Sequence, residues 1–316
     1  MLASNNVQEA HDFALIAHVA TLKASLPILH FFDGFRTSHE INKIDEIPAD
    51  LIKQMMPIKE LDEFRKRAHN PTHPTQTGTA QNPDIFFQNR EACNPLYDKA
   101  YKVVEKTMNE FAKLTGRKYK PFDYVGAKDA TDVIVAMCSG CEAVEAAIEV
   151  LNKKYKQKVG LVKVRLYRPF NGEAFAKSLP KTVKNITILD RTKEPGSLGE
   201  PLYVDVVSTL KENNIDVKVF GGRYGLGGKD FRTSDVARIV SNMHSKKPIL
   251  HFTVGINDDV THLSLPESEF KMPNPNCYEM LFYGLGSDGT VSANKSSIKI
   301  CGLNTDKYVQ GYFEYD

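Results

Sequence analysis

Two cysteines, Cys138 and Cys141, stand three residues apart where an apolar stretch ends and an amphipathic one begins. A C-x-x-C pair at the start of a helix is the arrangement of a thiol–disulfide redox site, because the helix dipole lowers the pKa of a thiol there. No second pair of this kind and no suitably spaced histidine completes a zinc site. The alternative is a tight turn in which Ser139 caps the helix and the small thiols pack beneath it. We favour this packing interpretation.

A glycine-rich stretch near the end of the chain has the spacing of a nucleotide-binding loop. Residues 284–289 read Gly-Leu-Gly-Ser-Asp-Gly and fit G-x-G-x-x-G between an expected strand and an expected helix. Glycines let the backbone approach a phosphate, which the N-terminus of a helix attracts. Asp306 has the spacing of a ribose-binding acid but precedes the expected strand, and Asp288 would repel a pyrophosphate unless it caps the helix. The stretch therefore indicates a phosphate or nucleotide-tail site more than an NAD site.

A second glycine-rich stretch, residues 221–228, also follows an expected strand. Its backbone N–H groups could bind a phosphate, or the turn could pack closely against another part of the chain. We favour a turn at an interface between domains.

Polar side chains crowd into the turn after the apolar stretch 28–32. They are His30, Asp33, Arg36, His39 and Glu40. Strand ends in α/β folds often line ligand sites, so a ligand contact stays open. A corner of structural ion pairs explains the same residues, and we favour it.

His69 and His73 have the helical spacing of two metal ligands. Pro71 lies between them and Pro74 follows, and both disfavour the helix that would bring the two rings onto one face. We expect packing in a loop and no metal here.

The first third of the chain shows helical patterning. A capping box of Asn6 and Glu9 precedes an expected helix over residues 7–26, which Pro27 ends. The further expectations are two short helices within residues 44–67, a long irregular interface segment over residues 69–95 and a helix over residues 97–114.

From residue 133 onward, apolar stretches alternate with amphipathic ones. The expected strands are residues 133–137, 160–167, 186–189 and 217–220, and the expected helices are residues 142–155, 173–179, 201–212 and 234–243. Continuous apolar strands between amphipathic helices indicate a parallel sheet covered on both faces. A strand from residue 278, a helix over residues 291–300 and a strand over residues 308–314 would begin one more βαβ unit.

Composition excludes several classes of protein. The 316 residues suggest about two domains. Because 41 Lys and Arg nearly balance 39 Asp and Glu, leaving a formal charge of +2, we expect neither a nucleic-acid nor an anionic-membrane partner. No apolar run approaches the roughly 18 residues of a membrane span. Five cysteines indicate a reducing compartment, and the first residues have no signal or transit pattern, so we expect the cytoplasm, with a hydrogenosome-like organelle as the alternative.

Several long strings together resemble one family, the pyruvate:ferredoxin (flavodoxin) oxidoreductases. The strings are residues 30–40, 78–85, 123–127, 164–170, 190–196, 222–227, 251–256 and 284–291. They stand in the family's order and cover essentially the whole chain. The resemblance is therefore specific.

The resemblance implies an internal fragment of a longer chain. Residues 1–117 would be the C-terminal part of the pyrimidine-binding first domain, residues 118–274 a second domain like the C-terminal domain of transketolase, and residues 275–316 the start of a third domain. The fold class expected is thus α/β, with parallel sheets covered by helices and a central domain flanked by two incomplete ones. The family's pyruvate-handling residues and cluster cysteines have no counterpart here, so no catalytic or metal-binding residue is assigned.

The resemblance also assigns a coenzyme A contact to the third domain. Carried over by position, the residues are Gly286, Ser287, Asp288, Gly289 and Thr290. A further lysine of the family falls just past Asp316. Two positions depart from the family: Cys138 stands where glycine is more usual, and Ser292 replaces a glycine.

The implied parent activity is the conversion of pyruvate and coenzyme A to acetyl-CoA and CO₂. It would use thiamine diphosphate, Mg²⁺ and [4Fe-4S] clusters, none of them expected on this chain, and a homodimer would pass electrons to ferredoxin or flavodoxin. The alternatives are a related 2-oxoacid oxidoreductase, a fused reductase that contains these domains, or a non-catalytic assembly or binding subunit.

Overall fold

A six-stranded sheet forms the centre of the protein, whose computed structural model describes residues 1–273 and 277–315. The strand order is β4-β6-β5-β7-β8-β9, and every pair is parallel except β4 with β6. The strands are β4 (Phe122–Gly126), β5 (Asp132–Ala136), β6 (Val159–Val164), β7 (Asn185–Asp190), β8 (Lys218–Arg223) and β9 (His251–Thr253). All residues of β5 and β6 are buried, as expected of strands whose two faces are both covered.

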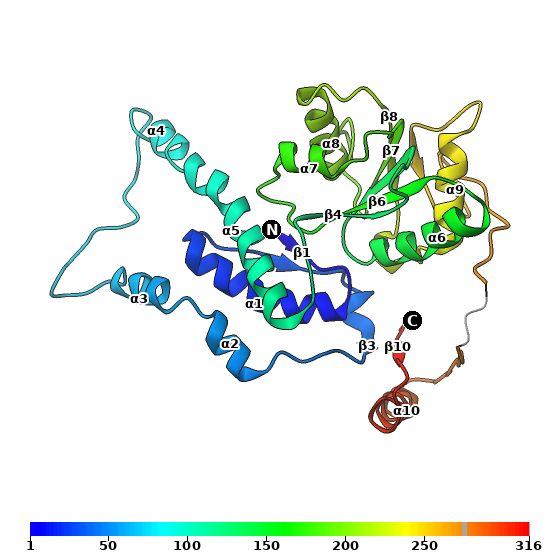
Figure 1. Ribbon diagram of the computed structural model, residues 1–316, viewed down its shortest axis with the longest axis horizontal. Helices are drawn as coiled ribbons and strands as arrows, with labels where there is room; N and C mark the ends of the chain where they lie inside the picture. Colours follow the sequence, from blue (N-terminus) through cyan, green and yellow to red (C-terminus); the bar gives the residue numbers. More distant parts are fainter. Residues whose placement is uncertain (274–276, 316) are drawn as a thin grey trace.

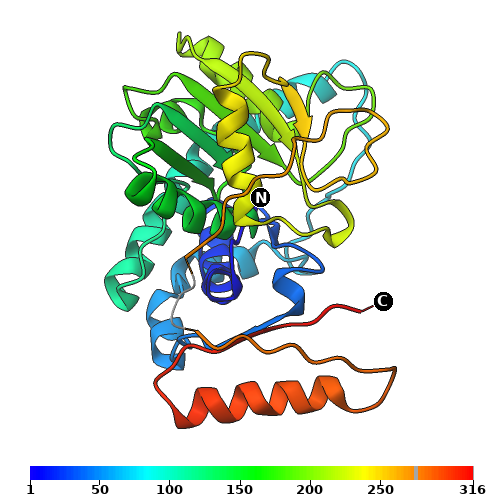
Figure 2. The same ribbon diagram turned by 90° about the vertical axis from the view of Figure 1, so that its right-hand side faces the viewer.

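Helices cover both faces of this sheet (Figure 1, Figure 2). Helices α6 (Gly140–Lys154) and α9 (Thr233–Met243) pack together on one face, and α7 (Gly172–Ser178) and α8 (Pro201–Glu212) pack together on the other. The predicted α/β class is confirmed, and the four helices predicted between these strands lie within two residues of the observed bounds.

The edge strand β4 is absent from the sequence-based expectation. It runs antiparallel to β6, and only Phe122 of its residues is buried. A half-exposed edge strand lacks the continuous apolar run that reveals a central one. The purely parallel sheet predicted from the alternation is therefore completed by one antiparallel strand.

The residues before β4 form a mainly helical layer beside the sheet. Helix α1 (Val7–Ala24) packs on α5 (Asn94–Thr115), and residues of both share one apolar core with α7 and α8. Asn6 accepts a hydrogen bond from the amide of Glu9, as the predicted cap requires, and Gly116 ends α5 with a φ of 76°. The short helices are α2 (Ala49–Met55), α3 (Ile58–Lys66) and α4 (Phe86–Glu91).

Strand β1 (Leu2–Ala3) joins this layer to the sheet. It pairs in parallel with β2 (His30–Phe31). Leu2 also forms an antiparallel bridge with Leu166, and the amide of Ala3 donates to the carbonyl oxygen of Arg165 at 2.7 Å. Residues from the start and the middle of the chain therefore lie side by side.

An arm projects from this layer (Figure 1). Residues 62–92 are all exposed, including Phe64, Phe86 and Phe87. The long irregular segment expected here is present, with α4 near its end. Its role as an interface segment stays a prediction.

The last part of the chain contradicts one expectation. Helix α10 (Thr290–Asn304) and strand β10 (Gln310–Tyr312) form, but residues 278–284 form no strand. Met280, Leu281 and Tyr283 are at least 75% exposed, and no strand within the described residues pairs with them. Strand β10 instead pairs antiparallel with β3 (Glu40–Asn42). The predicted βαβ unit is wrong here, because an apolar run becomes a strand only when a neighbour pairs its backbone.

A buried ion cluster joins the helical layer to the sheet. Arg165, immediately beyond β6, donates to the carboxylate of Glu9 at 2.7 Å and to that of Asp123 at 2.8 Å. The side chains of Arg165 and Glu9 are 4% and 5% exposed. Removing the cation would leave a buried carboxylate unpaired, which is far more costly than never having buried the pair.

We therefore predict that Arg165→Met lowers the free energy of unfolding by about 3–5 kcal/mol. Urea unfolding followed by circular dichroism measures it. Lys153→Met is the control, because Lys153 and Glu149 form an exposed pair at 2.6 Å on one turn of α6, and such pairs contribute little. Equal losses in both variants would contradict a structural role for the buried cluster.

Candidate functional site

The carboxyl edge of the sheet meets the turn at residues 33–40. The carboxylate of Asp33 accepts a hydrogen bond from the backbone amide of Ser139, just after β5, at 2.7 Å, and it forms an ion pair with the guanidinium of Arg191, just after β7, at 3.0 Å. Arg191 also donates to the carbonyl oxygen of Gly225, beyond β8, at 2.8 Å. Three loops are thereby tied to one turn.

The same turn holds the C-terminal segment. Arg36 pairs with Asp230 at 2.9 Å, and its guanidinium lies 4.4 Å from the ring centroid of Tyr312. The hydroxyl of Tyr312 donates to the carbonyl oxygen of Phe35 at 2.8 Å, and Nδ1 of His39 lies 3.0 Å from the carbonyl oxygen of Phe313. The polar side chains of this turn therefore make structural contacts, as the predicted corner of ion pairs requires.

His30 and Glu40, the other polar residues of this corner, also have hydrogen-bonding partners. Nε2 of His30 lies 2.7 Å from the hydroxyl of Ser4. The carboxylate of Glu40 accepts a hydrogen bond from the side-chain amide of Asn42 at 3.2 Å. Glycine-rich residues 221–228 contact Arg191 through Gly225 and approach Phe35 through Gly228, where an added Cβ would lie 3.3 Å from that of Phe35. This contact supports the predicted interface turn.

A polar cavity of about 270 Å³ lies within the corner. Its lining comes from all three parts of the chain: Asn5, Arg36 and Glu40 near the start, Ser139 and Arg191 in the centre, and Gln310 near the end. Both arginines already face an aspartate, Asp230 and Asp33. The cavity therefore belongs to the joint between the parts.

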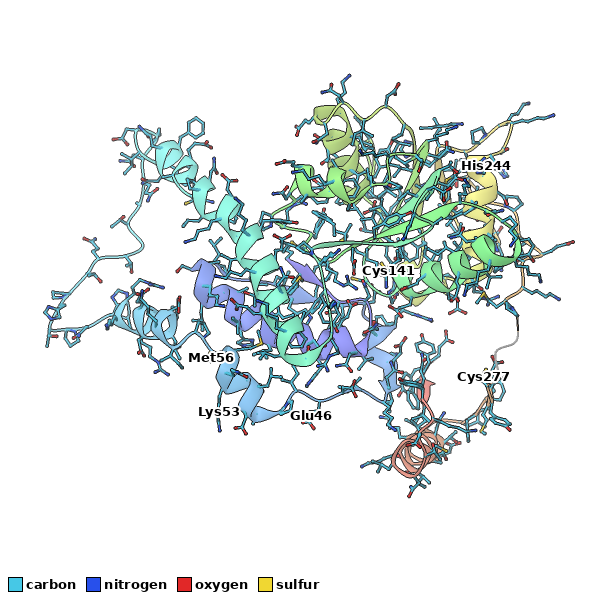
Figure 3. The ribbon with its side chains drawn as sticks, viewed as in Figure 1. Glu46, Lys53, Met56, Cys141, His244 and Cys277 are labelled. Atoms are coloured by element: carbon cyan, nitrogen blue, oxygen red, sulfur yellow. The ribbon has the colours of Figure 1, made fainter. Side chains whose placement is uncertain are left out.

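The cysteine pair is buried beside this joint. Cys141, near the start of α6 (Figure 3), is fully buried, and Cys138 is 5% exposed. Burial raises the pKa of both thiols, and for Cys138 the neighbouring Asp33 carboxylate raises it further. Desolvation outweighs the helix dipole that would favour a thiolate, so the structure supports packing.

The predicted coenzyme A loop is exposed at the start of α10. Asp288 accepts the amide of Thr290 at 2.9 Å, its hydroxyl at 2.7 Å and the amide of Leu285 at 3.1 Å. These hydrogen bonds lower the pKa of Asp288. The aspartate thus binds the first amide of the helix, as expected of a cap. Because the Thr290 hydroxyl also donates to Asp288, this hydroxyl is already hydrogen-bonded within the loop. Gly286 has no atom within 4 Å of an ideal Cβ position, and the other amides of the first turn have no partner inside the helix.

Asp190 is the polar group that sequence reasoning left without a role. Its carboxylate accepts the amides of Leu202 and Tyr203 at 3.0 and 3.1 Å, which caps α8. Burial raises its pKa to about 6, against the effect of these hydrogen bonds. The sequence does contain a signal for this residue, because Asp190 is an acidic residue at the end of an apolar strand, directly before Arg191.

The comparisons with known proteins agree with one another. Residues 1–109 match the family model described as "Pyruvate flavodoxin/ferredoxin oxidoreductase, thiamine diP-bdg", and residues 130–236 match "Pyruvate:ferredoxin oxidoreductase core domain II". The whole chain is 55% identical to the pyruvate:ferredoxin oxidoreductase of Moorella thermoacetica, and 51% identical to the probable pyruvate-flavodoxin oxidoreductase of Escherichia coli. It is also 51% identical to the mitochondrial pyruvate dehydrogenase [NADP(+)] of Euglena gracilis.

The chain belongs to the pyruvate:ferredoxin (flavodoxin) oxidoreductase family. It spans 27% of the length of the Moorella and Escherichia relatives and 18% of the Euglena relative. Within the described residues, no helix combines the length and apolarity needed to cross a membrane.

Metal and iron–sulfur cofactors do not fit the donor groups of the described residues. No three His, Cys, Asp or Glu side chains of the described residues converge as metal ligands. His69 lies near the hydroxyl of Thr77 at 3.2 Å in an exposed segment, and a turn joins Asn70 to His73. The five cysteines are all free: Cys93, Cys138, Cys141, Cys277 and Cys301. We therefore derive no step through Mg²⁺ or an iron–sulfur cluster.

The backbone at position 138 would suit the glycine that the family resemblance implies there. Cys138 has a φ of 59°, in the left-handed region that favours glycine. For other residues this conformation costs about 1–2 kcal/mol. The cysteine is thus a tolerated substitution at a turn that follows β5.

We predict that Cys138→Gly combined with Cys141→Ser leaves the protein folded, with Cys138→Gly alone changing the free energy of unfolding by no more than about 1 kcal/mol. The strain relieved is about 1–2 kcal/mol, and the flexibility of glycine in the unfolded chain offsets roughly 0.5–1 kcal/mol of it. Thermal unfolding measures the stability. Thiol titration of the parent protein, with Cys93 and the exposed cysteines as internal controls, should find the buried pair unreactive at pH 7. A buried thiol with a pKa below 7, or a reversible disulfide, would overturn the packing interpretation.

Proposed function

We propose that this chain is part of a thiamine diphosphate- and iron–sulfur-dependent oxidoreductase. The reaction would convert pyruvate and coenzyme A to acetyl-CoA and CO₂, and electrons would pass to ferredoxin or flavodoxin. The supporting observation is the alignment of the entire chain, at 55% identity, with an enzyme named pyruvate:ferredoxin oxidoreductase. Thiamine diphosphate supplies the decarboxylation chemistry in such an enzyme, and the protein supplies binding and orientation.

The role of this chain would be to hold the parts of the enzyme together. We propose that residues 1–117, 118–274 and 275–316 belong to three successive domains. The Asp33 and Arg36 contacts connect residues of all three ranges. A joint of this kind keeps binding sites on separate domains in register, which catalysis requires to within fractions of an ångström.

Coenzyme A would contact the loop of Gly286, Ser287, Asp288, Gly289 and Thr290. This loop is exposed, precedes a 15-residue helix, and leaves open space at Gly286. First-turn amides can donate to phosphate or pantetheine oxygens. Asp288, occupied as the helix cap, would stay off the ligand.

The cofactors Mg²⁺ and [4Fe-4S], a homodimer and a cytoplasmic location complete the proposal for the whole enzyme. A fused reductase is the second candidate. It is favoured by the relatives named pyruvate dehydrogenase [NADP(+)] in Euglena gracilis and Cryptosporidium parvum, of which this chain spans 18% and 16%. Under that alternative the electrons would reach NADP⁺ through a further domain.

We predict that the 316-residue chain alone does not oxidise pyruvate. Its described residues offer no cluster ligands and no metal site, and positioned cofactors carry this chemistry. The assay is coenzyme A-dependent reduction of an artificial acceptor after reconstitution with thiamine diphosphate, Mg²⁺, iron and sulfide. The intact enzyme is the positive control. Turnover by the chain above the buffer background would refute the prediction.

We also predict that Gly286→Val, in a full-length enzyme that contains this segment, raises the KM for coenzyme A about tenfold or more. The valine side chain would fill the space through which the ligand approaches the backbone, and a lost pair of charge-assisted hydrogen bonds costs at least this much. Formation of the first pyruvate-derived intermediate should be unchanged. Ser296→Val is the control, because Ser296 is exposed on the same helix but lies outside the loop. An unchanged KM, or loss of pyruvate binding, would remove the loop from the coenzyme A site.

A further inference from the structure

The two edges of the central sheet differ in what they contact. Loops that leave the carboxyl ends of β5, β7 and β8 are used by the Asp33 joint. Loops that enter the amino ends of the parallel strands lie at the opposite edge, and they carry most of the exposed charge of the sheet.

Eight lysines occupy this amino edge, and we call them the lysine edge. They are Lys128, Lys156, Lys158, Lys181, Lys184, Lys218, Lys246 and Lys247, and all are exposed. They come from the loops or first residues that open β5 to β9. No single run of sequence contains them, so the parallel topology assembles them.

Backbone hydrogen bonds place the central lysines in sequence across the edge. The carbonyl oxygen of Lys158 accepts the amide of Thr131, whose own carbonyl oxygen accepts the amide of Lys184 at 2.8 Å. The carbonyl oxygen of Lys184 accepts the amide of Lys218 at 2.9 Å. Neighbouring strands are roughly 4.8 Å apart, so the backbones of these lysines lie within one or two strand spacings of each other.

The charges are largely uncompensated. Within the described residues, only Lys158 among the eight forms an ion pair, with Asp129 at 2.5 Å. Asp216 is the other exposed carboxylate in these loops, and the buried Asp132 is already paired with His244 at 2.9 Å. With histidine counted as neutral, eight lysines against these three carboxylates leave a formal +5, while the whole chain has +2, so the remainder of the chain has −3.

The backbone at this edge disfavours phosphate as the ligand. Helices α6, α8 and α9 end here, with Tyr155, Asn213 and His244 as their C-terminal caps. Helix C-termini have partial negative charge, whereas phosphate sites use the amides of helix N-termini. Arginine binds phosphate with two parallel hydrogen bonds, whereas lysine offers only a point charge. A single-stranded nucleic acid would need several aromatic rings on which its bases stack, and Tyr155 is the one Tyr or Phe of these loops.

We propose that the lysine edge is a docking surface for the acidic face of a second protein. Long lysine side chains reach beyond the helix ends and meet carboxylates at the surface of the partner. Attraction of this kind mainly raises the association rate and weakens steeply with salt. The proposal is separate from the pyruvate reaction and holds whether or not that function is correct.

The test uses the full chain and a fluorescent polyglutamate 20-mer, with anisotropy measured across a salt series. Replacing Lys184, Lys218 and Lys247 together by Glu should weaken binding about tenfold or more at low salt and flatten its salt dependence. The control triple Lys53→Glu, Lys66→Glu and Lys299→Glu makes the same change of net charge at other exposed positions. It should retain most of the affinity.

Three results would overturn the proposal. The first is equal weakening in the control triple, which would mean that only net charge matters. The second is tighter binding of a 20-base-pair DNA duplex or of phosphatidylserine vesicles than of polyglutamate. The third is protection of these lysines from an amine-labelling reagent in a full-length enzyme without any partner, which would make the edge internal. Thermal unfolding reports whether each triple is folded, and a Lys→Gln triple at the same positions should lose affinity in the same direction if the Glu triple unfolds.

Discussion

One carboxylate, that of Asp33, links the parts of this chain. It accepts the backbone amide of Ser139 beyond β5 and faces the guanidinium of Arg191 beyond β7, and both partners are more than a hundred residues away in sequence. A partly buried carboxylate is stable only if its lone pairs are occupied, so the turn at residues 33–40 has essentially one position relative to the sheet. The contacts of Arg36, His39 and Tyr312 depend on that position. The polar cavity is what remains between the three parts once these bonds form.

The sheet could be predicted from sequence because its strands are continuous apolar runs with amphipathic helices between them. Strand β4 could not, since its half-exposed residues have no such run. Residues 278–284 show the opposite failure: their apolar residues predict a strand, yet no neighbour within the described residues pairs with it. The local sequence pattern shows that a segment can form a strand, and hydrogen bonding to a neighbouring strand decides whether the strand forms.

The candidate sites divide in the same way. The crowd of polar residues after β2 is visible in the sequence, but its partners Ser139, Arg191 and Asp230 are too distant along the chain for spacing to reveal them. The position of Cys138 and Cys141 at a helix start would lower the pKa of their thiols, whereas burial would raise it. Only the structure shows that burial prevails. The coenzyme A loop rests on family resemblance, to which the structure adds the role of Asp288 as a cap.

The pairing of β1 has a consequence for how the protein is made. Leu2 and Ala3 are synthesised before their bonding partners Leu166 and Arg165, which follow some 160 residues later. At synthesis rates of roughly 5–20 residues per second, that delay is about 8–30 s. During that delay α1 can form, and among the described residues β1 has only β2 as a strand partner. A nascent chain of this length exposes an unpaired edge of the kind that chaperones cover, so the order of synthesis, and not the final stability, sets the most vulnerable stage of its folding.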